Sequence, residues 1–188
     1  MSETCFVLDV ETDGPNITNN SMFWFGAVVL TEDLSETFEG RMCPVYDTYC
    51  PTALAVSGKS REEILNWDHP SIVMPQFVLW VEEHLRPHTK PQTWSDNNGY
   101  DMTWLNYYLA KYTSRPLLFG HSSRNISDRH KGLMEGREMA GIKDSPQLKR
   151  SFEHLRKTVH DHNPKNDAVG NAEALLTLKL YGLKVQVQ

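Results

Sequence analysis

The chain has 188 residues, of which 39% are hydrophobic and 23% charged, and its formal net charge is −5. This length predicts one domain, residues 1–188, around a single core. No apolar run approaches the roughly 20 residues of a membrane-spanning helix, and an acidic residue, Glu3, stands where a signal peptide would be basic. We therefore expect a cytoplasmic protein without a membrane partner. Its three cysteines form no CxxC pair, which excludes a zinc ribbon and a disulfide framework.

The charges are unevenly distributed along the chain. Residues 1–100 contain 15 acidic and 5 basic residues, whereas residues 124–157 contain 9 basic and 5 acidic residues. An acidic first half next to a basic stretch indicates carboxylates that hold metal beside a surface that contacts phosphate. Two solvated faces of opposite charge would explain the same pattern.

The first predicted elements are three strands. CFVLDVET (5–12) is a short apolar run that ends in acids, which is typical of a central strand that opens into a site. TDGPN breaks the chain, and MFWFGAVVL (22–30) predicts a second strand. After a turn, TFEGRMCPV (37–45) predicts a third, so residues 5–45 should form an antiparallel meander.

Helices dominate the middle of the chain. SGKSREEILN (57–66) starts a helix with a capping box of Ser60 and Glu63. SIVMPQFVLWVEEHLRP (71–87) predicts a longer helix, kinked or begun near Pro75 and stopped before Pro87. PQTWS (91–95) is a short strand. The helix over 100–112 has an apolar face at 3.6-residue spacing, and its inward residues should be Met102, Leu105, Leu109 and Tyr112.

The last part of the chain predicts a strand at LLFGH (117–121), then loop and one helix over 121–150. Asn163 and Pro164 are a suitable N-cap and first position for a final helix. The residues that this helix should bury are Ala168, Ala172, Leu175, Leu176 and Leu180. Strands followed by mixed strand and helix units predict an α/β domain.

Three groups of acids are candidates for chemistry. Asp9 and Glu11 are two apart on a strand and so share one face, where they repel unless a cation lies between them. Asp101 opens a helix, where the macrodipole alone would also favour it. His162 and Asp167 flank the start of the last helix, which needs neither of them. Each group alone is also explained by solvated turn or cap residues.

Together, these groups resemble one family. LDVETDG, NNGYD and HNPKNDA match, in order and approximate spacing, the motifs of the DEDDh 3′–5′ exonucleases, which include RNase T, oligoribonuclease, the proofreading epsilon subunit and phage exonucleases such as DexA. The sister DEDDy group would have Tyr at the place of Asn163. The resemblance covers almost the whole chain and implies an RNase H-like fold with a five-stranded mixed β-sheet flanked by helices.

The resemblance also implies an activity and a set of roles. Asp9, Glu11, Asp101 and Asp167 would hold two Mg²⁺ or Mn²⁺ ions, and His162 would be the general base in hydrolysis of single-stranded RNA or DNA from its 3′ end to 5′-mononucleotides. Many relatives form homodimers.

Four further residues are candidates for contacts around this centre. Thr12 would lie beside the terminal ribose and Asn97 belongs to the second motif, so both are candidate substrate contacts. Trp24 could stack on a base, although core packing is the more common role of such a residue. His160 is the rival base, but we expect it to point away from the site.

Two rival functions are also compatible with the sequence. One is a nucleic-acid-binding protein or scaffold that uses a degenerate exonuclease fold, and the other is an RNase H-like endonuclease. The five intact reactive positions argue against the first, and the H-x4-D pattern argues against the second.

Overall fold

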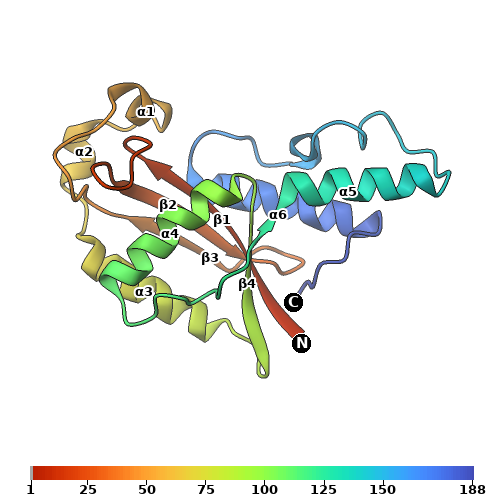
Figure 1. Cartoon of the computed structure of the whole chain (residues 1–188), viewed down its shortest axis with the longest axis horizontal. Helices are drawn as coiled ribbons and strands as arrows, with labels where there is room; N and C mark the ends of the chain where they lie inside the picture. The colour runs from red at the N-terminus through yellow and green to blue at the C-terminus, as the bar shows by residue number, and fades with distance from the viewer. Residues whose placement is uncertain (1) are drawn as a thin grey trace.

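The computed structural model describes residues 2–188, and its centre is a five-stranded mixed sheet (Figure 1). The strands are β1 (Ser2–Thr12), β2 (Met22–Val29), β3 (Thr37–Arg41), β4 (Thr89–Ser95) and β5 (Arg124–Asn125). They are ordered β3-β2-β1-β4-β5, with β1 central. β1, β2 and β3 pair antiparallel, and β4 pairs parallel with both β1 and β5. The predicted fold, the meander and the central position of the first strand are confirmed.

Helices cover both faces of this sheet (Figure 1). They are α1 (Pro51–Val56), α2 (Arg61–Leu65), α3 (Pro70–Glu83), α4 (Asn98–Tyr112), α5 (Ile126–Met139) and α6 (Pro164–Leu180), with a 3-10 turn, η1 (Phe152–Leu155), before α6. α3 and α4 pack on one face and α6 on the other. The core therefore has two layers separated by the sheet.

The alternation of side chains along β1 determines which of its residues reach which layer. Phe6, Leu8 and Val10 pack with α3 and α4, whereas Cys5 and Val7 pack with α6. Asp9 and Glu11 continue the second series and so point toward the start of α6. The strand is apolar where it is covered and acidic where the cover ends.

One predicted strand is wrong. The chain forms a turn at 116–119 instead, in which the Leu118 N–H donates to the Arg115 carbonyl, and the Gly120 N–H donates to the Leu117 carbonyl. Leu118 and Phe119 are buried in the layer of α3 and α4, and the Phe119 ring lies edge-on to Phe6 with centroids 5.8 Å apart. The apolar run supplies core side chains without joining the ladder, and the fifth strand comes later, at β5.

Two predicted details of α6 also differ from the structure. Leu180 is 85% exposed and Leu176 is only partly buried, whereas Leu178 is fully buried. A helical face that contains Ala168 and Leu175 continues three residues on, at 178, because 3.6 residues make one turn. Leu180, five beyond Leu175, falls on another face.

Smaller differences concern the ends and caps of elements. The third strand stops at Arg41, four residues earlier than predicted. The longer helix predicted near Pro75 is α3, which begins at Pro70 and contains Pro75. The Ser60 hydroxyl caps α2 by accepting from the Glu63 N–H at 3.1 Å, but the Glu63 carboxylate binds Lys59 at 2.8 Å and does not close the capping box. Tyr112 is only partly buried.

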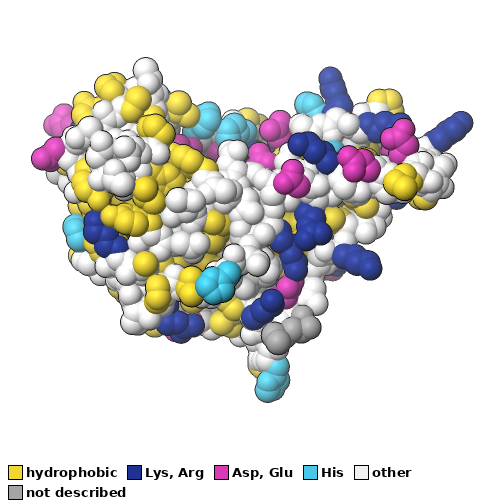
Figure 2. All heavy atoms as spheres, in the orientation of Figure 1, with side chains coloured by type: hydrophobic (Ala, Val, Ile, Leu, Met, Phe, Trp, Pro, Cys, Tyr) yellow, Lys and Arg dark blue, Asp and Glu magenta, His cyan; other side chains and the backbone are white. Residues whose placement is uncertain are grey.

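The surface shows the charge asymmetry of the sequence. In Figure 2, dark-blue Lys and Arg side chains gather over α5 and its flanking loops, while hydrophobic side chains are frequent over the opposite part of this face. Within residues 2–188, no helix combines the length and apolarity needed to cross a membrane.

Candidate metal centre

Three of the predicted acids meet at the C-terminal end of β1. Asp9, Glu11 and Asp167 each offer a carboxylate oxygen, and these atoms lie within 4.8 Å of one another. Asp101, in the first turn of α4, lies outside this group but close enough that its charge affects both Asp9 and Glu11. The structure thus brings together acids that are up to 158 positions apart in the sequence.

A close approach of backbones places Asp167 beside Asp9. Gly26 on β2 pairs with Asp9, and a Cβ at Gly26 would lie 2.3 Å from the Lys165 nitrogen in the first turn of α6. Only glycine therefore allows the start of α6 to lie this deep on the sheet. Asn163 fixes the start of the helix, because its side-chain oxygen accepts from the Lys165 N–H at 3.1 Å.

The carboxylates are poorly compensated. Burial, followed by repulsion from Asp101, Glu11 and Asp167, raises the pKa of Asp9 well above its ordinary value. Burial and the charges of Asp167 and Asp101 raise the pKa of Glu11 to about 8. Burial, and to a smaller extent Asp96, raises the pKa of Asp101 to about 7. A bound cation would relieve these penalties.

Two oxygens of the group also lack a partner. Oδ2 of Asp101 and Oδ2 of Asp167 are buried and accept no hydrogen bond. Buried polar atoms are rarely left unsatisfied, so each such atom calls for an explanation. Carboxylate oxygens are the donors that Mg²⁺ and Mn²⁺ prefer, and the free lone pairs of Asp101 and Asp167 fit such an ion.

Two histidines flank the acids. His162 Nδ1 lies 3.6 Å from Glu11 Oε1, and His160 Nδ1 lies 2.7 Å from Asp167 Oδ1. The two rings are edge-on with centroids 4.4 Å apart. The expectation that His160 points away from the site is therefore wrong. The backbone at His162 is left-handed, with φ of 57°, just before α6 begins.

Arg156 is a site residue that the sequence did not single out. Its side chain is only 8% exposed, and Nη2 donates to Asp167 Oδ1 at 2.8 Å. A Cβ at Gly170 would lie 2.5 Å from Arg156 Nε, so the absence of a side chain there makes room for the guanidinium. Sequence reasoning included Arg156 only among the basic residues of 124–157. No local sequence pattern identifies Arg156, because its partner Asp167 is eleven residues away.

A cavity of about 410 Å³ opens beside the acids. Its lining includes Asp9 and Asp167, the arginine just described, and Asn97. Asn97 is exposed and begins α4, where its carbonyl accepts from the Asp101 N–H at 2.9 Å. The predicted substrate contact Asn97 thus lies at the mouth of the site and also anchors one of its carboxylates.

The two other predicted substrate contacts lie deeper. Thr12 is buried, and its hydroxyl donates to the Gly14 carbonyl at 3.0 Å. Trp24 is 3% exposed, and its Nε1 donates to Glu39 at 2.9 Å. In this arrangement Trp24 has a packing role, and its ring offers no open face for a base.

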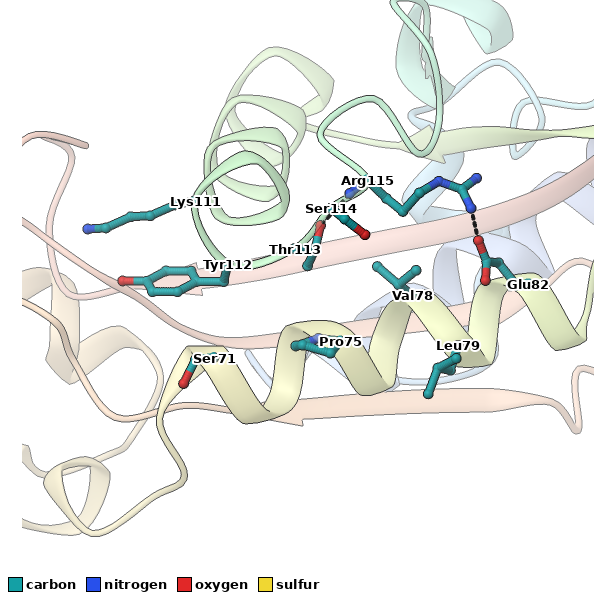
Figure 3. A pocket seen from close by; sticks show the side chains of 10 residues that line it. All are labelled: Ser71, Pro75, Val78, Leu79, Glu82, Lys111, Tyr112, Thr113, Ser114 and Arg115. Carbon is teal, nitrogen blue, oxygen red and sulfur yellow. Dashed lines mark hydrogen bonds and ion pairs between the residues drawn. The ribbon is translucent and has the colours of Figure 1, made fainter.

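A larger hollow, of about 690 Å³, lies between α3 and the end of α4 (Figure 3). Glu82 is the single carboxylate that lines it, and Figure 3 shows Glu82 paired with Arg115. A hollow whose one carboxylate is paired with an arginine lacks the ligands for a metal site. The smaller cavity beside Asp9 is therefore the candidate site.

Comparisons by sequence find no family model and no curated protein that match the chain. Comparison by structure finds nucleases. Cell-death related nuclease 4 (CRN-4) is 19% identical with a TM-score of 0.72, over 98% of this chain and 66% of that one. The nuclease domain of 3′hExo, a DEDDh family member bound to rAMP, is 14% identical with a TM-score of 0.67, over 98% and 96%.

E. coli Exonuclease I in complex with an oligonucleotide is 16% identical with a TM-score of 0.68, over 96% of this chain and 42% of that one. This chain thus spans just under two thirds of the length of CRN-4 and less than half of Exonuclease I. The sheet order and the helices on its two faces agree with the predicted resemblance, and the chain has the RNase H-like fold of the DEDDh 3′–5′ exonucleases.

Proposed function

We propose that this protein is a metal-dependent 3′–5′ exonuclease that hydrolyses single-stranded RNA or DNA and releases 5′-mononucleotides. The observation that carries the proposal is the meeting of Asp9, Glu11 and Asp167 within 4.8 Å, with the His162 ring beside them. The names of similar structures give support, since one is a complex of Exonuclease I with an oligonucleotide and another concerns 3′-end recognition of an mRNA stem-loop by a 3′-exonuclease.

The proposed centre would hold two ions of Mg²⁺ or Mn²⁺. Asp9, Glu11, Asp101 and Asp167 would be their protein ligands. When bound, the ions supply a polarised water for in-line attack and stabilise charge on the leaving 3′ oxygen. The fit rests on oxygen-only donors and on the two unpartnered carboxylate oxygens.

The residues of the chain perform the remaining steps. His162 accepts the proton of the attacking water, a task for which an imidazole is suited near neutral pH. Its ring is 41% exposed, so the proton can pass on to solvent. Thr12 and Asn97 flank the acids and would orient the 3′-terminal nucleotide. Basic residues of 124–157 would hold phosphates further along the strand.

The decisive experiment is incubation of the protein with 5′-labelled single-stranded RNA and DNA in the presence of Mg²⁺, Mn²⁺ or EDTA. The expected result is a ladder that shortens one nucleotide at a time from the 3′ end, with no reaction in EDTA. Asp101→Asn is the matched inactive control. Cleavage of a circular single strand would instead indicate an endonuclease, and binding without cleavage would indicate a scaffold. Either result would overturn the proposal.

A further inference from the structure

A second group of metal-binding side chains lies at the edge of the carboxylate cluster. His160, His162 and Asp167 each offer one ligand atom, and these atoms lie within 4.8 Å of one another. The group shares Asp167 with the acidic centre but otherwise uses nitrogen donors. Residues 160–163 and the first turn of α6 supply all of it, so a short stretch of chain forms the group.

The donor set differs in kind from that of the acidic centre. Two imidazoles and one carboxylate are a common ligand set for Zn²⁺, whereas Mg²⁺ prefers oxygen donors only. Three protein ligands leave a fourth position for water or a phosphate oxygen. The rings of His160 and His162 are 52% and 41% exposed, so this open position faces solvent.

The shared carboxylate gives an independent indication of a ligand. The side chain of Asp167 is 1% exposed, and its Oδ2 has no hydrogen-bond partner. Arg156 and His160 both contact the other oxygen, Oδ1, at 2.8 and 2.7 Å. A buried carboxylate with one oxygen left free, on a residue that contacts an imidazole, is available as a metal ligand.

We propose that His160, His162 and Asp167 form a second site, which shares Asp167 with the acidic centre, for a transition-metal ion of the Zn²⁺ class. Occupation requires a small movement. His160 Nδ1 and Asp167 Oδ1 are 2.7 Å apart, whereas two ligand atoms on a tetrahedral Zn²⁺ with bonds of about 2.0–2.1 Å are about 3.3 Å apart. The half-exposed His160 ring can open this gap by a rotation of its side chain.

Binding at this site would compete with the acidic centre for Asp167 and would engage His162. Zn²⁺ also binds nitrogen-containing sites more strongly than Mn²⁺ does. Micromolar Zn²⁺ should therefore suppress Mg²⁺-dependent hydrolysis. This inhibitory consequence rests on the proposed function, whereas Zn²⁺ binding itself does not.

The test is calorimetric titration of the full chain with ZnCl₂, together with Co²⁺ titration followed by the visible absorption of tetrahedral Co²⁺. We expect one high-affinity Zn²⁺ site in the wild type, tighter than any binding to the oxygen donors of the acidic centre. His160→Ala and His160→Asn should each weaken Zn²⁺ binding at least about tenfold, because one of three ligands is lost. His154→Ala is the matched control, since His154 lies on the preceding turn η1, outside the group, and binding should be unchanged.

Asp101→Asn separates the two proposals. This variant should lose Mg²⁺-dependent hydrolysis but keep the Zn²⁺ site, because Asp101 belongs only to the acidic centre. Absence of hydrolysis in the wild type with intact Zn²⁺ binding would refute the exonuclease alone. Equal Zn²⁺ affinity in wild type and both His160 variants, or loss of binding in His154→Ala, would refute the Zn²⁺ site.

Discussion

The candidate site has a strand half, Asp9 and Glu11, and a loop half, His160 and His162, and the two are held in different ways. Asp9 and Glu11 lie on β1, which is hydrogen-bonded to β2 on one side and to β4 on the other. The histidines lie in residues 156–163, which form no helix or strand. The Glu173 carboxylate on α6 holds this segment, since its Oε2 accepts from the N–H groups of Lys157 and Thr158, each at 2.7 Å.

This difference assigns metal binding to the strand half and proton transfer to the loop half. The pairing of β1 fixes the positions of two carboxylates, as a two-ion centre requires, because strand register cannot shift without exposing the core. The segment that carries His160 and His162 depends on a few side-chain contacts and on the cap of α6. We therefore expect mutations in the strand half to abolish activity, and mutations in the loop half to lower it by degrees.

The largest effect should come from two carboxylates, Asp9 of the strand half and Asp101 in the first turn of α4. Asp9→Ala or Asp101→Ala should abolish metal-dependent hydrolysis, while the fold is retained or becomes more stable without metal. Both acids have raised pKa values because burial and neighbouring carboxylates disfavour their charge. Removal of one relieves a penalty that only a cation otherwise offsets. Turnover and thermal unfolding in EDTA measure the two effects, and normal turnover in either variant would exclude these acids as metal ligands.

The next effect concerns the base. His162→Ala should lower the rate about 10²–10⁴-fold, the usual contribution of a general base, with metal binding nearly intact. Asp167→Asn should weaken activity and metal binding together, since Asp167 belongs to the carboxylate group. His160→Ala should cost much less in rate. Turnover and Mn²⁺ titration of the three variants make the comparison. If His160→Ala proves the inactive variant, the assignment of the base is reversed.

These two halves also differ in how far the sequence predicts them. Alternation along β1 is a local pattern, and it correctly places Asp9 and Glu11 on one face of the central strand. Asn163 as N-cap and Pro164 as the first helical residue also correctly predict the start of α6. Such features are readable because the residues involved are close in sequence and obey a fixed period.

What the sequence did not predict depends on contacts across the chain. The approach of α6 to Gly26 and the burial of Arg156 against Gly170 involve residues that are distant or irregularly spaced. The position of His160 beside Asp167 and the left-handed backbone at His162 were not indicated by the sequence pattern. The predicted strand over 117–121 was wrong for a similar reason, since an apolar run can be buried in a turn as well as in a strand.

A third prediction tests whether the close approach at Gly26 positions the site. Gly26→Ala should push the start of α6 off the sheet, because the new Cβ would lie 2.3 Å from backbone atoms of Pro164 and Lys165. We expect a loss of about 1–3 kcal/mol in the free energy of unfolding, typical of overpacking. The turnover of the variant that remains folded should also fall at least about tenfold, since Asp167 moves with the helix.

Gly132→Ala on α5 is the control for Gly26→Ala. Its added Cβ would meet no atom within 4 Å, and alanine favours helix over glycine by up to about 1 kcal/mol. Urea unfolding and turnover should therefore show an unchanged or slightly more stable and fully active protein. Equal behaviour of the two variants would show that α6 tolerates displacement.

A smaller effect should follow from loosening the loop half. Glu173→Ala removes the acceptor of the Lys157 and Thr158 N–H groups and should lower turnover roughly 3–10-fold, equivalent to about 1 kcal/mol of lost positioning. Metal affinity at the acidic centre should change little, because the strand half is untouched. Glu138→Ala, at an exposed position on α5, is the matched control. A Glu173→Ala enzyme with weakened Mn²⁺ binding and normal turnover would contradict the division of roles.

The smallest effect is a pH dependence of the metal-free fold. The pKa of Glu11 rises from 4.5 to about 8, and that of Asp101 rises from 3.8 to about 7. Between these limits the folded state binds more protons than the unfolded state, so the free energy of unfolding falls as pH rises. In EDTA, the melting temperature should therefore decrease from pH 5 to pH 8.5. Mn²⁺ should restore it most at the alkaline end, where the ionised carboxylates bind the cation.

Asp101→Asn should flatten the slope, because the asparagine does not titrate. A melting temperature in EDTA that rises over this range, in wild type and Asp101→Asn alike, would mean that the acids are compensated within the protein and do not require a cation.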